Sequence, residues 1–546
     1  MVRLKGYFFY CAIITLLSCG KNQPYEPGST TLPIKTHNKS SDINIATADE
    51  ESAVVQLENL KKSWAKLKNE TYKVNDVVYR YLTPDIEMAY CFASKDGKKI
   101  YSNHSATTGF EIASISKIFT SLWALNSQKQ GNSLLPKRFV SDFYFNPETG
   151  TLYIDGSIDP MFGIDRLTDV LDRLNAQLAK NGVLVHKPLS SIVLSNFIQV
   201  PVYTYQGTYE LYVRDTGINL ATNDFLSKEY LRKSLILLQK NVHPLLLNIP
   251  LDELDIQRVT KAEILETISD QTSLIKITSV QRPLNHVLLY INTFSNNPGA
   301  DLLFQMMGGS SKFFDFYRDY VPANLSSLIT DNNADENQQY GYDKDVPFAF
   351  YSGSGLPNKS LLGPAAFEEE VASNLDEDQL QASSNVESRI KRNKASCQLI
   401  FQSIYGLEQT SIDSSIKVEE LLSINGHGTL KKIISSSLPT RSFIGKTGSL
   451  RNLLTLAGLF KTDRGSRAFY LGFFRKNRAD DGTVRNNAFN TNATNFVRAN
   501  VTPELLVILQ KYYQKKPMLY SPDKDLMAAL VSNSFLATST VINESL

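Results

Sequence analysis

Residues 113–125 read ASISKIFTSLWAL, a strongly apolar stretch with helical spacing that contains one polar pattern, Ser-x-x-Lys from Ser114 to Lys117. Positions i and i+3 share one face of a helix, so the Lys117 amine can reach the Ser114 hydroxyl. A serine hydroxyl needs an adjacent base to become a useful nucleophile, and a lysine can be that base where its neutral form is favoured. The stretch therefore predicts an activated serine at the start of a buried helix.

A second polar pattern, Ser295-Asn296-Asn297, lies between two apolar helical runs. A Ser-x-Asn triplet in that setting can place the Ser295 hydroxyl and the Asn297 amide in a cleft. Taken alone, the triplet is more simply explained as a helix N-cap, a position that both residue types favour.

A third pattern, Lys446-Thr447-Gly448-Ser449, lies at the edge of a predicted strand, where Gly448 lets a ligand backbone approach closely. Lys446 and Thr447 would offer a cation and a hydroxyl to a substrate carboxylate. The backbone N–H groups of Ser449 and Ser114 would together form an oxyanion hole. The simpler alternative is a turn with a solvated lysine.

The order of the three patterns is more specific than any one of them, because Ser-x-x-Lys, Ser-x-Asn and Lys-Thr-Gly in this order are the signature set of active-site-serine penicillin-recognising enzymes. Six other serines begin a Ser-x-x-Lys pattern: Ser18, Ser63, Ser273, Ser388, Ser414 and Ser521. The first two precede the folded hairpin, the third lies only 22 residues before Ser295, and the last three follow it. Ser114 remains as the candidate nucleophile.

Longer stretches resemble the D-alanyl-D-alanine carboxypeptidase/endopeptidase family, the class C, type-4 penicillin-binding proteins. Residues 295–309 (SNNPGADLLFQMMGG) are similar to its S-D-N-x-x-A-[ED]-x-L helix, and residues 353–356 (GSGL) to its D-G-S-G-L loop. Residues 426–430 (GHGTL) resemble its G-x-x-G-T-L segment, and residues 445–450 (GKTGSL) its A-K-T-G-S-L strand. The 181-residue gap from Ser114 to Ser295 also fits this family, which carries an insert there.

The resemblance implies an α+β fold: a β-lactamase/DD-peptidase-like catalytic domain, with an antiparallel sheet flanked by helices, split by an inserted α+β domain. It also implies a serine-type D-Ala-D-Ala carboxypeptidase/endopeptidase that acts on peptidoglycan stem peptides and is acylated by β-lactams. Ser114 would form the acyl-enzyme with Lys117 as base, and Ser295 and Lys446 would either relay protons or provide the electrostatic field that keeps Lys117 reactive. Substrate would be bound by Asn297, Thr447, Gly448 and Ser449.

Three departures from the family pattern bear on substrate preference. Ser352 stands where the family has the aspartate of D-G-S-G-L, and Pro357-Asn358 stand where Ser-Arg often follows. In the family that arginine helps to read the diaminopimelate end of the stem peptide. Asp159, in an Ile-Asp-Pro triplet similar to the family's Gly-Asp-Pro, is a further candidate for substrate binding.

Residues 1–19 (MVRLKGYFFYCAIITLLSC) have the layout of a secretory signal: Arg3 and Lys5, then an apolar run of about 11 residues that is too short to span a bilayer. The segment ends in Leu-Leu-Ser-Cys, which resembles a bacterial lipobox, so Cys19 is the predicted lipidation site. An ordinary signal peptide with a chance cysteine is the alternative. Residues 20–51 are polar and predict a flexible tether. The protein is therefore predicted to be a periplasmic lipoprotein of the cell envelope, anchored to a membrane.

The predicted domains are a catalytic domain over 52–130 and 262–515, an inserted α+β domain over 131–261, and a C-terminal tail over 516–546. Strands are predicted over 86–93, 99–101, 150–155, 191–194, 441–445, 453–460 and 468–475. Helices are predicted over 52–69, 113–125, 167–180 and 230–240, in the second part of 265–310, and beyond Val501. The charged, Ser-rich stretch 367–420 is predicted to lie on the surface.

The charge balance, 57 basic against 55 acidic residues, provides no basic field for nucleic acid. Six scattered histidines with no ligand spacing argue against a metal site, and no cofactor is implied. Cys91 and Cys397 either pair with each other or remain buried free thiols. The sequence does not indicate an oligomeric state.

Two alternative functions compete with the peptidase. A β-lactamase would need a deacylating glutamate in an E-x-x-L-N context between the second and third patterns, and the sequence has none there. A non-catalytic cell-wall-binding lipoprotein with the same fold is the other, although the intact serine, lysine and asparagine positions speak against it.

Overall fold

The structure, a computed structural model, describes residues 52–59, 72–74, 77–79, 86–131, 135–157, 159–161, 174, 176–180, 189–195, 204–206, 209–211, 254–270, 274–329, 342–343, 345–355, 392–431, 433, 437–450, 453–475, 494, 497–513 and 518–523. Cys19, the tether, the helix predicted over 230–240, Pro357-Asn358 and most of the C-terminal tail lie outside these ranges.

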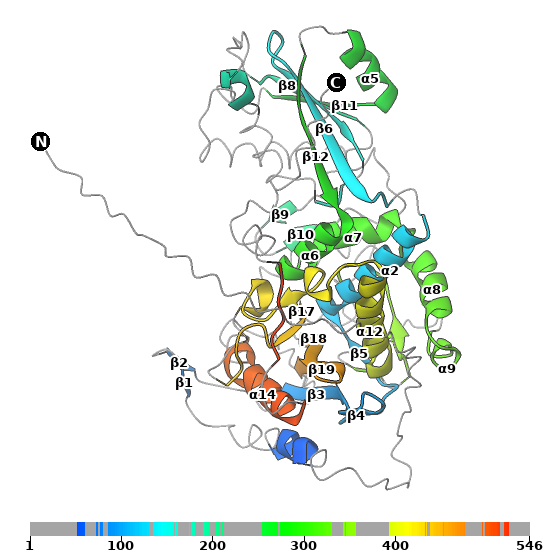
Figure 1. Ribbon diagram of the computed structural model, residues 1–546, viewed down its shortest axis with the longest axis vertical. Coiled ribbons are helices and arrows are strands. Elements are labelled where there is room, and N and C mark those ends of the chain that lie inside the picture. Colours follow the sequence, from blue (N-terminus) through cyan, green and yellow to red (C-terminus); the bar gives the residue numbers. More distant parts are fainter. Residues whose placement is uncertain are drawn as a thin grey trace, which may run out of the picture. The chain divides into compact units, whose positions relative to one another are not determined.

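The central element is a six-stranded antiparallel sheet with the order β16-β17-β18-β19-β3-β4 (Figure 1). Its strands are β3 (Ile86–Ala93), β4 (Ile100–Ser102), β16 (Ser423–Ile424), β17 (Phe443–Leu450), β18 (Leu453–Thr462) and β19 (Gly465–Arg475). The predicted hairpin and the three predicted C-terminal strands are thereby confirmed. Because β19 pairs with β3, early and late parts of the chain share one sheet.

Alternation along the strands gives this sheet two apolar faces. Along β18, Ala457 and Leu459 face one core, while Leu454 and Leu456 face the other. The first core contains α2, α6 and α12, and the second contains α14 and the helical residues 52–59. The helices are α2 (Ser116–Lys129), α5 (Lys261–Asp270), α6 (Leu284–Phe294), α7 (Asn297–Met306), α8 (Gly309–Tyr320), α9 (Ala323–Ser326), α12 (Cys397–Asp413) and α14 (Thr502–Tyr513). Among the described helices, none has both the length and the apolar character needed to cross a membrane.

A second, four-stranded sheet has the order β13-β5-β15-β14. Its strands are β5 (Gly109–Glu111), β13 (Tyr342–Asp343), β14 (Phe348–Ala349) and β15 (Lys394–Ser396). β5 leads directly into the 3₁₀ turn η2 (Ala113–Ile115) and then α2, so this sheet holds the segment that contains Ser114. Its partner β15 comes from more than 280 residues later in the chain.

A five-stranded mixed sheet, with the order β11-β8-β7-β6-β12, forms from strands between β5 and α6 in the chain. Its strands are β6 (Arg138–Asn146), β7 (Thr151–Gly156), β8 (Ser191–Ser195), β11 (Asp255–Val259) and β12 (Ile275–Pro283), and α5 packs against β7 and β8. β7, β8 and β11 run parallel, whereas β6 pairs antiparallel with β7 and β12. Two short hairpins complete the strands: β1 (Tyr72–Val74) with β2 (Val77–Tyr79), and β9 (Thr204–Gln206) with β10 (Tyr209–Leu211). The structure thus confirms the predicted α+β class, while the domain boundaries stay predictions.

The prediction that the stretch 367–420 lies on the surface is wrong for its second half. From residue 392 onward the chain forms β15 and then α12, whose buried residues belong to the first core. The cause is local composition: residues 397–407 read CQLIFQSIYGL, and the charges that suggested a surface lie mainly before them. Residues 367–391 lie outside the described ranges.

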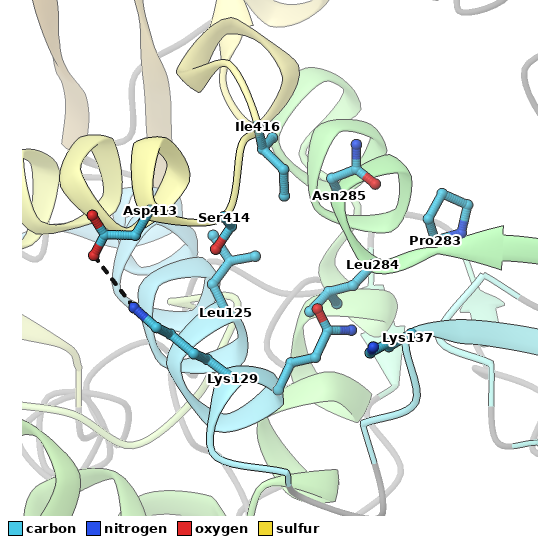
Figure 2. Close-up of a pocket in the computed structure, with 10 residues that line it drawn as sticks. Leu125, Lys129, Lys137, Pro283, Leu284, Asn285, Asp413, Ser414 and Ile416 are labelled. Carbon is cyan, nitrogen blue, oxygen red and sulfur yellow. Dashed lines mark hydrogen bonds and ion pairs between the residues drawn. The ribbon is translucent and has the colours of Figure 1, made fainter.

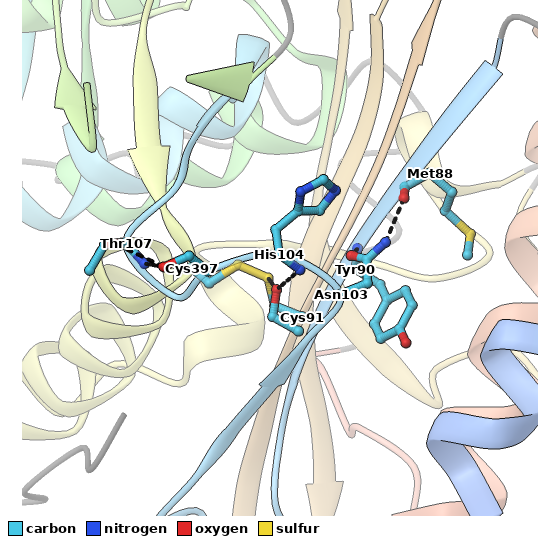
Figure 3. The surroundings of a disulfide bond; sticks show 9 residues. Met88, Tyr90, Cys91, Asn103, His104, Thr107 and Cys397 are labelled. Atoms are coloured by element: carbon cyan, nitrogen blue, oxygen red, sulfur yellow. Dashed lines mark hydrogen bonds between the residues drawn. A yellow bond between two sulfur atoms is a disulfide. The ribbon is translucent and has the colours of Figure 1, made fainter. Parts of the chain in front are cut away.

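A disulfide joins Cys91 on β3 to Cys397 at the start of α12, 306 positions later in the chain (Figure 3). Both cysteines are fully buried. Of the two alternatives left open by the sequence, the structure shows the pair. The bond ties the central sheet to the point where β15 becomes α12.

Candidate active site

Ser114 lies in a tight 3₁₀ turn and not, as the sequence predicts, within the helix itself. η2 ends where α2 begins, and Ala113, directly before the serine, has a φ of 44°. A non-glycine residue in this left-handed region is strained and persists only when its surroundings enforce it. The turn points the Ser114 hydroxyl towards the first turn of α2.

Lys117 is completely buried, and its amine is the centre of the site. The Nζ atom lies 3.0 Å from Ser114 Oγ, 2.6 Å from Asn297 Oδ1 and 3.0 Å from the Ser354 carbonyl oxygen. Asn297 and Ser354 offer only acceptors to this amine, so they occupy two of its N–H bonds. These acceptors hold Nζ at hydrogen-bond distance from Ser114 Oγ, which is the distance that a base needs to take the serine proton.

The residues of the second predicted pattern, Ser295-Asn296-Asn297, have two different roles. Asn296 caps α7 by accepting a hydrogen bond of 2.8 Å from the Gly299 amide, so the N-cap explanation is correct for this one residue. Ser295, at the end of α6, has a φ of 56° and presents its hydroxyl to Lys446, whose Nζ donates to it over 3.0 Å. Asn297 contacts Lys117, as described above. The cap therefore orients its two neighbours towards two different lysines.

Lys446 on β17 is also completely buried. Its Nζ donates to Ser295 and, over 2.8 Å, to the carbonyl oxygen of Thr447. Burial holds the pKa of Lys446 well below its usual value, and the positive charges of Lys117 and Arg498 lower it further. Arg498 lies in the π-helical turn Val497–Val501 before α14, and nothing in its sequence context predicts a place near the site.

Asp301 on α7 is the acidic group of the site. Its Oδ1 accepts a hydrogen bond of 2.7 Å from the Ser354 amide, and it interacts electrostatically with Lys117. Desolvation raises the pKa of Asp301 to about 6, although the Ser354 hydrogen bonds and Lys117 act in the opposite direction. Asp301 is the acidic position of the family helix pattern, but the sequence alone assigns it no role.

The part of β17 beside the serine lies against the turn that contains Ser114. Among the described strands, β16 pairs only with Ile444 and Gly445, so residues 446–450 have no strand partner on that side and contact η2 instead. The close contact between β17 and the residues before Ser114 depends on Gly448. A Cβ at this position would lie 2.8 Å from the Ile112 carbonyl oxygen and would overlap Thr455 Oγ1. Ser449 and Thr447 lie on the same strand, and the Thr447 side chain is almost fully buried.

Asp159 is buried, and its Oδ1 accepts a hydrogen bond of 2.8 Å from the Met161 amide. Pro160 lies beside Gly299 in the first turn of α7, close along the chain to Asn297. This places Asp159 near the helix that contains Asn297 and Asp301. Its binding of substrate stays a prediction.

Away from these residues, a pocket of about 430 Å³ lies between α2, the start of α6 and the end of α12 (Figure 2). Ser414, one of the rival Ser-x-x-Lys serines, lines it, but Lys417 does not. Two lysines line it: Lys129 is paired with Asp413 at 3.3 Å and is largely exposed, and Lys137 is exposed as well. The pocket therefore lacks the buried amine that a serine nucleophile needs.

Within the described part of the chain, no three His, Cys, Asp or Glu residues are grouped so that they could hold a metal ion.

No family model and no curated protein matches this chain. Solved structures do resemble it. Bd3459, a predatory peptidoglycan endopeptidase from Bdellovibrio bacteriovorus, is 17% identical with a TM-score of 0.49, covering 80% of this chain and 96% of its own. Penicillin binding protein 4 from Haemophilus influenzae is 15% identical with a TM-score of 0.39, covering 77% and 96%. A β-lactamase from Chitinophaga pinensis is 11% identical with a TM-score of 0.34, covering 83% and 98%. At these values, function has to be argued from this chain's own residues.

Proposed function

We propose that this protein is a serine-type D-Ala-D-Ala peptidase that cleaves peptidoglycan stem peptides through an acyl-enzyme on Ser114. One observation carries the proposal: a buried lysine amine lies 3.0 Å from a serine hydroxyl and is held there by two acceptors from distant segments. A surface Ser-x-x-Lys pair would not be enclosed in this way. The same geometry meets the requirement for a nucleophile with its base at hydrogen-bond distance.

In the first step, the Ser114 proton passes to the Lys117 amine while Oγ attacks the carbonyl carbon of the penultimate D-Ala. The oxygen of the tetrahedral intermediate accepts hydrogen bonds from the backbone amides of Ser114 and Ser449, the proposed oxyanion hole. When the C–N bond breaks, the departing D-Ala amine takes a proton from the Ser295 hydroxyl, which Lys446 replenishes. The proton that Lys117 took from Ser114 then passes to Lys446, so that both lysines regain their starting protonation states before deacylation. The product is an ester between the stem peptide and Ser114.

In deacylation Ser114 becomes the leaving group, and a new nucleophile attacks the ester. Water, or an amine from a second stem peptide, gives up a proton to Lys117 and attacks the ester carbonyl. The Ser114–acyl bond breaks, and the serine recovers its proton. Hydrolysis is the carboxypeptidase or endopeptidase outcome, according to whether the departing amine belonged to a free D-Ala or to a cross-link.

Recognition of the substrate would rest on β17. An extended peptide can add to the edge of residues 446–450, while Lys446 and Thr447 face its terminal carboxylate and Asn297 binds its amide. Arg498 adds a positive charge to this end of the site. A β-lactam presents a carboxylate and a strained amide in the same arrangement, so penicillins should acylate Ser114.

We further propose that Cys19 is lipidated and anchors the enzyme in the periplasm.

Labelling with a fluorescent penicillin tests the proposal. The wild type should be stably tagged, and Ser114→Ala should lose the tag while keeping its thermal unfolding midpoint. Ser414→Ala is the matched control, because it removes the serine of a rival Ser-x-x-Lys pattern from the pocket in Figure 2 and should label normally.

The other outcomes identify the alternatives. A wild type that never labels would indicate a non-catalytic cell-wall-binding scaffold, and rapid turnover of the drug would indicate a β-lactamase. Tagging that persists in Ser114→Ala would show that the nucleophile is another residue. Digestion of purified sacculi, with separation of the fragments, then distinguishes carboxypeptidase from endopeptidase activity.

A further inference from the structure

A buried asparagine outside all three sequence patterns contacts both sides of the site. Asn393 directly precedes β15 and is 1% exposed. Its Nδ2 donates to Ser116 Oγ over 2.8 Å and to the carbonyl oxygen of Ser352 over 2.6 Å. Its Oδ1 accepts from the Tyr351 amide over 2.7 Å. One side-chain amide thus joins the first turn of α2 to the loop of residues 351–355.

The loop that Asn393 holds provides an acceptor for the catalytic lysine. The carbonyl oxygen of Ser354 accepts from Lys117, and that of Gly353 accepts from Thr120 on α2 over 3.0 Å. Gly355 has a φ of 79° and lies against the Ala113 carbonyl oxygen, where any side chain would overlap. Ser352, at the position of the family's aspartate, accepts from the Gly355 amide over 3.1 Å and closes the turn. A shift of this loop would therefore move an acceptor of the Lys117 amine.

Asn393 also holds the turn that contains the serine. Its carbonyl oxygen accepts a hydrogen bond of 3.1 Å from the Ile112 amide, two residues before Ser114. Its side-chain partner Ser116 donates in turn to the Ala113 carbonyl oxygen over 2.7 Å. β15 continues from Asn393 into Cys397, which the disulfide fixes to β3. The asparagine is thus held by the sheet on one side and holds the turn on the other.

We propose that Asn393 is a positioning residue that sets the distance between the Lys117 amine and the Ser114 hydroxyl by clamping the 351–355 loop to the nucleophile turn. It touches neither substrate nor the reacting atoms. The proposal rests on the proposed function, because it assigns Asn393 a role in the acylation step. An asparagine suits the position, since its amide is both a double donor and an acceptor, whereas aspartate lacks the donors and leucine lacks both.

The test separates acylation from binding. Penicillin acylation of the wild type, Asn393→Ala and Asn103→Ala is followed over a range of drug concentrations, which yields the acylation rate constant and the dissociation constant of the reversible complex. Asn103 is the matched control: its Oδ1 accepts from the Tyr90 amide over 2.9 Å and its Nδ2 donates to the Met88 carbonyl oxygen over 2.8 Å, at the far edge of the central sheet (Figure 3).

Asn393→Ala should lower the acylation rate constant by roughly 10- to 100-fold and leave the dissociation constant within about threefold, since a misplacement of about 1 Å costs on the order of 100-fold. Asn103→Ala should lower the thermal unfolding midpoint without changing acylation. If Asn393→Ala does not fold, Asn393→Asp keeps the acceptor for the Tyr351 amide, loses both donated bonds, and should show the same selective loss.

An acylation rate constant unchanged in the foldable variant, or one that falls equally in Asn103→Ala, would overturn the positioning role. A wild type that is not acylated would overturn the proposed function and this role with it. A wild type that is acylated, with an Asn393 variant acylated equally fast, would overturn the positioning role alone.

Discussion

Gly448 offers the sharpest test of how closely β17 and the nucleophile turn must approach each other. Replacing it with alanine places a Cβ 2.8 Å from the Ile112 carbonyl oxygen and 3.0 Å from the Ala113 Cβ, and in overlap with Thr455 Oγ1. Thr455 can rotate away, but it then gives up its 3.3 Å hydrogen bond to the Ile112 carbonyl oxygen. The other two contacts are relieved only if the backbone before Ser114 moves.

The size of that movement follows from the contact distances. Ordinary contact begins at 3.4 Å, so the Ile112 oxygen has to recede by about 0.6 Å. Because a displacement of about 1 Å costs on the order of 100-fold in rate, a shift of this size should slow acylation by roughly tenfold, equivalent to about 1.4 kcal/mol. The lost Thr455 hydrogen bond should lower the free energy of unfolding by a further 1 kcal/mol or so, about the usual net value of one hydrogen bond.

The assay is the rate of penicillin acylation measured beside thermal unfolding. Gly131→Ala is the control: this glycine has a φ of 81° and a Cβ added to it would meet no atom within 4 Å, so alanine should cost about 1 kcal/mol of stability without touching the site. Adding Thr455→Ala to Gly448→Ala should leave the acylation rate low, since the contacts with the Ile112 oxygen and the Ala113 Cβ remain. A Gly448→Ala protein that is acylated within twofold of the wild-type rate would refute the reasoning.

Two further predictions concern stability. The pKa of Asp301 is raised to about 6 in the folded state, so the folded protein binds its proton more tightly than the unfolded chain does, and this contribution is lost as pH rises from about 4 through 6. Thermal unfolding of the wild type and Asp301→Asn is measured in a pH series. Over this range the free energy of unfolding of the wild type should fall by up to about 3 kcal/mol relative to that of the variant, and the same pH dependence in both proteins would contradict this. Replacing Cys91 and Cys397 together with alanine opens a loop of 306 residues and should cost roughly 3–5 kcal/mol, measured as a lower unfolding midpoint that no longer responds to reductant. Equal midpoints for the oxidised wild type and the double variant would exclude this role.

The sequence predicts the parts of the site that depend on short, ordered patterns. Ser114, Lys117, Ser295, Asn297 and Lys446 are brought together by contacts from separate segments, and the strands that contain or flank them have strong apolar patterns. Within each pattern the residues have a fixed spacing, so these candidates can be named before the fold is known.

The remaining groups could not be found in this way, because each is a single polar residue placed by tertiary packing. Asn393 lies in the run Arg-Asn-Lys-Ala-Ser, which has no capping or catalytic spacing, and Arg498 precedes a helix as an ordinary cation would. Ser354 contributes its backbone carbonyl, which no side-chain pattern can reveal. The same limit explains the error over residues 392–413, where charges from the preceding segment obscured a short apolar helix.

Two of the three described lysines that are 0% exposed lie together at this site, the third being Lys394 on β15, and their shared burial argues against a purely structural role. Lys117 and Lys446 are each 0% exposed, and removing an amine from water is costly unless its hydrogen bonds are replaced and its charge is compensated or lost. The carboxylate of Asp301 interacts with Lys117, but its own pKa is raised, and Arg498 adds a third cation beside Lys446. An apolar pair of similar volume would stabilise such a site at least as well. The arrangement is therefore unfavourable for stability, but it holds an amine 3.0 Å from the Ser114 hydroxyl, which an acylating enzyme requires and a wall-binding scaffold does not.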